Sequence, residues 1–181
     1  MKKNRISTVF ALSLLLVLSS CASIPKKVKP GDTLVIGRAE IFTHDYAKYN
    51  DIDLNGIFHS EMELTLKDMV FGKERIIKPN EDGCFYISGL RAHGTYGFTK
   101  VVYSVHNNDG SGVKMSVNIS NPKTFIPYDN IVVNIGCTYY DFDGITNYVT
   151  WQTRNHYYVQ QFYEDLDQES EWFDKEIVNQ R

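Results

Sequence analysis

Three cysteines offer the most distinctive chemistry in this sequence, and Cys21 stands in a setting unlike the other two. It ends the string LVLSSC, where an apolar run passes through two serines, and alanine and serine follow it. A thiol is a strong nucleophile once ionised, so a cysteine among small neighbours is well placed to accept a covalent group. We therefore take Cys21 as the first candidate site.

The residues before Cys21 have the order of a secretory leader. Residues 1–5 carry three basic side chains, and residues 9–18 are almost purely apolar. About ten apolar residues are too few to cross a hydrocarbon core of about 30 Å, which needs about 20 in a helix. A basic start, a short apolar stretch and small residues predict a signal peptide over residues 1–20.

Leu18-Ser19-Ser20-Cys21 resembles the lipobox of bacterial lipoproteins, although the two serines would also suit an ordinary signal peptidase. The resemblance implies a diacylglycerol thioether on Cys21, cleavage just before it, and a further acyl group such as palmitate on the new amino terminus. It also implies a place in the bacterial cell envelope. Residue 22 is alanine rather than aspartate, which in the enterobacterial lipoproteins of this kind favours the outer membrane.

Residues 21–31 then have the composition of a tether, rich in Pro, Lys and Gly. One acyl chain gives only marginal attachment, whereas two or three hold a protein at a membrane without a spanning segment. Lys26, Lys27 and Lys29 either rest on anionic headgroups or are simply solvated.

The composition of the remaining chain excludes some functions. The chain has 19 basic and 22 acidic residues, and loss of the three basic leader residues leaves a formal net charge of about −6. An acidic chain without a basic cluster beyond the tether is a poor match for nucleic acid. About 160 residues form one domain by the usual size relation. The aromatic content of 13% favours strands.

A pass along the chain predicts a mainly β domain over residues 32–152. Strict alternation over 61–67 places Met62, Leu64 and Leu66 on an inward face. The predicted strands are 33–42, 61–67, 84–88, 96–105, 113–119, 124–126 and 130–138, with a long connection over 43–59. About seven strands with frequent turns predict an antiparallel, immunoglobulin- or prealbumin-like β-sandwich.

The strings GRAEI, MELTL and IKPNEDGCFYISGLRAHGTYGF resemble the carboxypeptidase-regulatory-like, prealbumin-type sandwich. Its characteristic glycine, aromatic and leucine positions are matched by Gly83, Phe85, Leu90, Gly94 and Tyr96. The resemblance covers about residues 33–105, and the tail beyond Cys137 has no counterpart. Because that family is mostly non-catalytic, the likeness implies a scaffold rather than an enzyme.

Cys84 and Cys137 both fall in predicted strands. In an oxidising compartment they could form a disulfide, closing a loop of about 54 residues and contributing roughly 4 kcal/mol. The alternative is two separate buried thiols that behave as small apolar side chains. Neither has the histidine spacing of a zinc site.

Residues 153–181 predict a C-terminal amphipathic helix, with the helical pattern over 157–178. Phe162, Leu166, Phe173 and Ile177 fall near one face, and acidic residues occupy the rest. We expect the apolar face to pack on the sandwich, and the alternative is a helix that docks on another protein.

Catalytic and metal-binding motifs are not evident, so we expect no enzyme and no cofactor. The histidines are scattered, and no Gly-x-Ser-x-Gly elbow or phosphate-binding loop occurs. The carboxylate pairs Asp141/Asp143 and Asp165/Asp167 stop short of a calcium loop.

Two functions of different kinds remain. The first is a membrane-anchored envelope lipoprotein that acts as a structural or protein-interaction module, with another envelope protein as its partner. The second is a glycan- or small-ligand-binding module, with stacking on Tyr139, Tyr140, Tyr148 and Trp151. The competing interpretation of these aromatics is core packing under the C-terminal helix.

Overall fold

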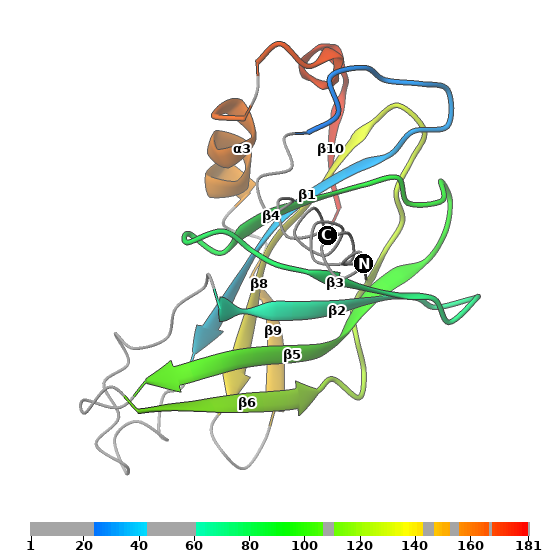
Figure 1. Ribbon diagram of the computed structural model, residues 1–181. Coiled ribbons are helices and arrows are strands. Elements are labelled where there is room, and N and C mark those ends of the chain that lie inside the picture. Colours follow the sequence, from blue (N-terminus) through cyan, green and yellow to red (C-terminus); the bar gives the residue numbers. More distant parts are fainter. Residues whose placement is uncertain are drawn as a thin grey trace, which may run out of the picture.

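The architecture is a β-sandwich of two five-stranded sheets, seen in Figure 1. The computed structural model describes residues 24–42, 61–106, 111–142, 147–152, 156–166 and 168–180. The leader, residues 21–23 of the tether and the 43–59 connection lie outside the described residues.

The first sheet is mixed, with the order β10-β8-β1-β4 and with β9 also paired to β8. Its strands are β1 (Leu34–Phe42), β4 (Cys84–Ser88), β8 (Val132–Phe142), β9 (Asn147–Gln152) and β10 (Ile177–Asn179). β8 runs parallel to β1 and β10, whereas β4 and β9 pair antiparallel to their neighbours. This sheet therefore differs from the purely antiparallel arrangement that the sequence predicts.

The second sheet is antiparallel throughout, with the order β3-β2-β5-β6 and with β7 also paired to β5. Its strands are β2 (Glu63–Asp68), β3 (Glu74–Ile77), β5 (Tyr96–His106), β6 (Gly112–Asn118) and β7 (Thr124–Phe125). The predicted inward residues Met62, Leu64 and Leu66 are each at most 1% exposed, as expected. The alternation is not strict, because Thr65, predicted to face water, is only 7% exposed.

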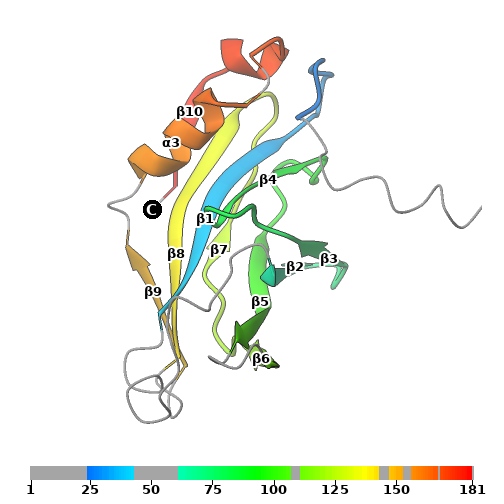
Figure 2. The same ribbon diagram turned by 60° about the vertical axis from the view of Figure 1, so that its left-hand side comes forward.

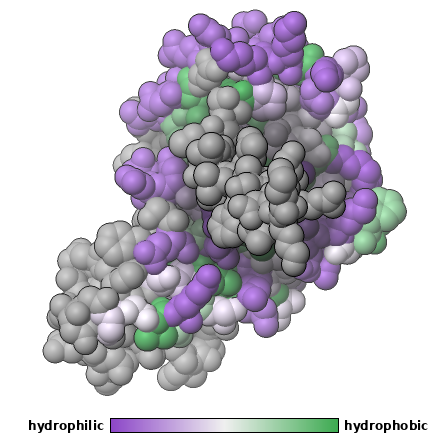
Figure 3. Space-filling view, in the orientation of Figure 1, coloured by the Kyte–Doolittle hydropathy of each residue, from purple (hydrophilic) through white to green (hydrophobic). Residues whose placement is uncertain are grey.

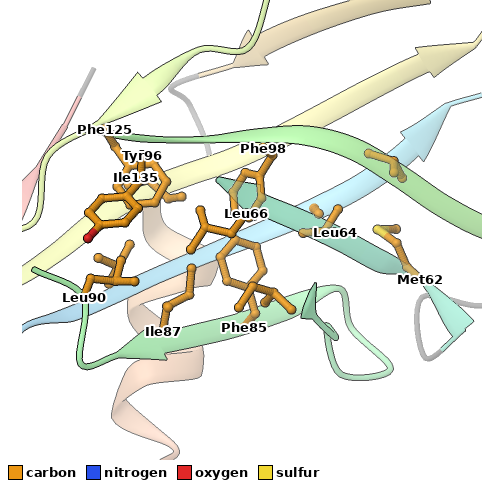
Figure 4. Close-up of a cluster of buried hydrophobic side chains, with 14 of the residues drawn as sticks. Met62, Leu64, Leu66, Phe85, Ile87, Leu90, Tyr96, Phe98, Phe125 and Ile135 are labelled. Atoms are coloured by element: carbon orange, nitrogen blue, oxygen red, sulfur yellow. The ribbon is translucent and has the colours of Figure 1, made fainter. Parts of the chain in front are cut away.

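The main core lies between the two sheets (Figure 4). Phe85 from β4 meets Phe98 from β5 edge to face, with ring centroids 5.5 Å apart. Gly37 in β1 makes room for this contact, because a Cβ there would lie 2.7 Å from Cζ of Phe85. The glycine thus lets the ring of Phe85, from the neighbouring strand of the same sheet, lie across β1.

A second apolar cluster covers the outer face of the first sheet, seen edge-on in Figure 2. It joins the outward side chains of β1 and β8 to the helix α3 (His156–Glu164) and the 3-10 turn η5 (Glu171–Asp174). Its buried members are Ile24, Leu34, Ile36, Val132, Val159, Tyr163 and Trp172. The first sheet is therefore buried on both faces.

The sandwich and the seven predicted strands are confirmed, with small differences at their ends. The predicted C-terminal helix is only partly right, because α3 ends at Glu164 and the chain finishes as η5 and β10. The Ser170 hydroxyl caps η5 by accepting from the Trp172 N–H, and β-branched Ile177 and Val178 pair with the edge of β8. Such capping and β-branched residues favour these states over a continuous helix.

Three of the four apolar side chains predicted for the packing face of the tail do pack on the sandwich, whereas Phe162 lines a groove beside α3. Leu166, Phe173 and Ile177 all contact the outer cluster. Phe173 also stacks on Tyr163, with ring centroids 4.8 Å apart. The tail is thus part of the fold even where it is not helical.

Of the two alternatives for Cys84 and Cys137, the structure shows separate thiols and no disulfide. Both residues pair with Arg38 on β1, from opposite sides. Because β1 lies between β4 and β8, two inter-strand distances separate the cysteines, and their Cα atoms lie about 10 Å apart. A disulfide needs a Cα–Cα distance of less than about 7 Å. The two cysteines are therefore separate buried thiols.

We predict that these thiols stay reduced in the folded protein even under oxidising conditions. In a Cys21→Ser variant, unfolding in denaturant without reductant should expose two reactive thiols per chain, counted with a thiol-specific reagent. The native protein should react slowly, because Cys84 and Cys137 are 5% and 1% exposed. A thiol count that rises only after reduction would contradict the observed strand order.

Candidate functional site

Of the four aromatic residues predicted to stack on a ligand, Tyr140 is the one whose side chain lies in the described part of the structure. Tyr140 is 1% exposed and belongs to the core between the sheets, so its ring is not available to stack on a ligand. Tyr139, Tyr148 and Trp151 lie on the paired strands β8 and β9, where only their backbone is described.

The burial of Tyr140 has a local cause in β8. The pairing of β1 with β8 shifts register between Ile36 and Arg38, and β8 carries the extra residue at this point. Gly136 there has a φ of 71°, and its N–H donates to Oδ1 of Asn134. A β-bulge of this kind changes which side chains point inward further along the strand. Tyr140 is therefore a core residue, but it packs between the two sheets and not under the C-terminal helix, where the competing interpretation placed it.

A groove of about 530 Å³ runs between α3 and the edge of the first sheet. Arg38, Asp82, Cys84 and Asp165 are among its lining residues. The Arg38 guanidinium donates to the Asp82 carbonyl oxygen and lies 2.6 Å from the Glu40 carboxylate. Burial raises the pKa of the Cys84 thiol to about 11, so it is protonated at neutral pH and is a poor nucleophile.

The described residues contain no group of three His, Cys, Asp or Glu side chains placed to hold a metal ion. Asp143 and Asp167, one partner of each carboxylate pair, lie outside the described part of the chain.

The N-terminal segment provides the first feature that the sequence did not indicate. Ile24 is 1% exposed and inserts into the outer cluster beside Trp172. The Ser170 hydroxyl donates to the Pro25 carbonyl oxygen at 2.7 Å, and the Glu171 N–H donates to the Lys26 carbonyl oxygen at 2.9 Å. Residues 24–28 are therefore docked on the C-terminal tail, although the sequence assigned them to a tether.

Charged side chains add to this docking. The Val28 N–H donates to the Glu171 carboxylate at 2.8 Å, and Lys26 Nζ lies 2.8 Å from Glu169 Oε2. The Lys26–Glu169 pair is solvent-exposed and contributes little, on the order of 0 to 1 kcal/mol. Burial of Ile24 and the backbone hydrogen bonds are thus the main stabilising terms.

The turn between β2 and β3 is the second feature. It holds Met69, Val70 and Phe71, which are 41%, 67% and 66% exposed. In the space-filling view, hydrophobic residues protrude at the right-hand edge, where Figure 1 places this turn (Figure 3). Large apolar side chains grouped on a surface mark contact sites for proteins or membranes.

Asp68 fixes the backbone of this turn. Its carboxylate accepts from the N–H groups of Val70 at 2.9 Å and Phe71 at 3.0 Å, and its carbonyl oxygen accepts from the Gly72 N–H at 2.8 Å. The Met69 N–H donates to the Thr95 carbonyl oxygen at 2.9 Å. The apolar side chains are therefore displayed on a backbone in which each N–H group from Met69 to Gly72 donates a hydrogen bond.

Arg91, in the link between β4 and β5, supports the turn from the side. Its guanidinium lies 3.4 Å from Oδ2 of Asp68 and 4.8 Å from the centre of the Phe71 ring. A cation over an aromatic face is an attractive contact. Phe71, Arg91 and Asp68 also line a groove of about 500 Å³ that opens beside the turn.

Sequence reasoning missed the residues of the turn. The signal was the string DMVFGK, in which three apolar residues occupy a connection that is more often polar.

Among the described residues, no helix is both long and apolar enough to span a bilayer. Comparison with known proteins gives no match: no family model, no curated protein and no solved structure matches the chain. The class of protein therefore follows from its strands and contacts, and it is a β-sandwich with an N-terminal segment docked on its outer face.

We predict that Ile24→Ala destabilises the fold by about 2 kcal/mol or more, as large-to-small changes in a core do. The free energy of unfolding measured in urea would show this, and tryptic cleavage after Lys26 or Lys27 should accelerate in the variant. Exposed Lys27→Ala is the matched control and should leave the unfolding free energy unchanged. Equal stability of the two variants would mean that Ile24 is not buried in the outer cluster.

We predict that Asp68 makes the stability of the protein depend on pH. The hydrogen bond from the Phe71 N–H, with those from Val70 and Arg91, lowers the pKa of the Asp68 carboxyl against the opposing effect of burial. Because the folded state holds the carboxylate more strongly, its contribution is complete above the unfolded pKa of about 4 and is lost as pH falls through the lower folded pKa.

Asp68→Asn should therefore lower the unfolding midpoint at pH 7 and reduce its decline in acid, as thermal melts across this range would measure. Glu81→Gln, on an exposed residue, should keep the wild-type decline. An unchanged acid profile in Asp68→Asn would count against the role of its carboxylate.

Proposed function

We propose that this chain is a lipoprotein of the bacterial cell envelope, anchored in the outer membrane through lipid on Cys21. The sandwich then acts as a non-catalytic interaction module. The lipobox-like string before Cys21 supports the anchor, and the position of Ile24 carries the proposal. Only two residues separate Cys21 from this buried side chain, so the folded domain begins directly after the lipid attachment site.

The non-catalytic role rests on the chemistry of the described residues. The thiol in the groove beside α3 has a raised pKa. The Arg38 guanidinium beside it is already engaged by Asp82 and Glu40. By contrast, the exposed apolar turn after β2 has the character of a contact surface.

We predict that Cys21→Ser abolishes lipid attachment and releases the protein from membranes. Metabolic labelling with an alkyne fatty acid, followed by membrane fractionation, measures both effects. Cys84→Ala is the matched control, because it removes a cysteine that is buried in the fold, and it should keep both the label and the membrane location. Wild-type protein that is unlabelled and wholly in the soluble fraction would refute the lipoprotein proposal.

A further inference from the structure

We propose that the β2–β3 turn is a second membrane contact, in which Val70 and Phe71 enter the lipid headgroup region beside the anchor. This inference rests on the proposed lipidation of Cys21 and adds an orientation to it. The exposed apolar surface of the β2–β3 turn thus contacts a phospholipid bilayer.

The chain between the proposed lipid anchor and the folded domain is short. Three residues after Cys21 the chain is fixed at Ile24, and three residues span at most about 11 Å. A lipid on Cys21 therefore holds the docked N-terminal segment close to the membrane surface. The domain cannot hang on a long tether, because residues 24–28 are bonded to the tail.

The β2–β3 turn lies at the same end of the sandwich as the start of β1. The start of β1 meets the end of β4, with Leu34 opposite Ser88 and the Thr33 hydroxyl donating to the Leu90 carbonyl oxygen at 2.9 Å. The next residue, Arg91, contacts Asp68 and Phe71 of the turn. Figures 1 and 2 both show the blue N-terminal segment at the top of the molecule, with the link after β4 and the β2–β3 turn below it on the right.

The side chains of the turn also suit contact with a membrane surface. Val70 and Phe71 expose about two thirds of their surface, at 67% and 66%. The charged residues around them comprise four cations and two carboxylates: Lys67, Lys73, Arg75, Arg91, Asp68 and Glu74. Both carboxylates have a cation within 4 Å, at 3.4 Å for Asp68 and 3.7 Å for Glu74. The surround is thus net positive.

Apolar and aromatic side chains bordered by Lys and Arg are typical of surfaces that enter the interface of anionic bilayers. A rigid turn suits this task, because the backbone hydrogen bonds held by Asp68 keep Val70 and Phe71 exposed before any contact is made. Little conformational entropy is then lost on insertion.

Depth-dependent fluorescence quenching tests the proposal. Lipidated protein carrying Phe71→Trp is reconstituted in vesicles of phosphatidylethanolamine with a minority of phosphatidylglycerol, with and without bromine on the acyl chains. The wild-type protein, measured in the same vesicles, gives the signal of the native Trp151 and Trp172, which is subtracted. The matched control is Val113→Trp, which replaces another exposed apolar residue (53%) near the far end of β5.

We expect bromine to quench the tryptophan at position 71 several-fold more than the tryptophan at position 113. Equal quenching at the two positions, in vesicles that retain both variants, would overturn the membrane contact while leaving the anchor intact. Failure of both variants to sediment with vesicles would instead refute the anchor itself. If a protein of the native membranes bound the turn and abolished the quenching at position 71, the partner of the turn would be that protein. This outcome would also overturn the proposal.

Discussion

The requirement to cover the first sheet on both faces governs this structure. Leu34, Val35 and Ile36 are consecutive residues of β1, and all three are 0% exposed. Parallel strand pairs such as β1 and β8 need cover on each face. The second sheet covers one face, and the other is covered by α3, by Trp172 in η5 and by Ile24. The N-terminal segment is therefore drawn into the fold, which leaves little chain between the domain and Cys21.

Local patterns were sufficient to predict the sheets but not their pairing. Strict alternation over 61–67 and the turn residues around Gly83 identified β2 and β4, because these signals depend only on neighbours in sequence. The parallel pairing of β8 with β1, and hence the separation of Cys84 from Cys137, depends on contacts between distant residues. The spacing of apolar residues in the tail correctly predicted that the tail covers the sandwich. It did not predict that Ile177 pairs with Val132 in a strand instead of lying in a helix.

The candidate site was harder to predict for a similar reason. The apolar string MVF does not by itself predict an exposed turn. The turn is fixed by Asp68 and Arg91, which are 23 residues apart in the sequence. Likewise, the bulge at Gly136 decides that Tyr140 faces the core, and no periodicity in the sequence marks it. Residue types alone led to the proposal of lipid on Cys21, whereas geometry was needed to find the exposed apolar turn.

Amide hydrogen exchange of the lipidated, full-length protein tests the central claim that the N-terminal segment belongs to the folded domain. The N–H groups of Val28 and Glu171 donate across the junction between this segment and the tail. We predict that both exchange slowly, together with the rest of the outer cluster. Exchange of Val28 and Glu171 at the rate of an unstructured peptide would contradict the account, because the domain would then hang on a long, mobile tether.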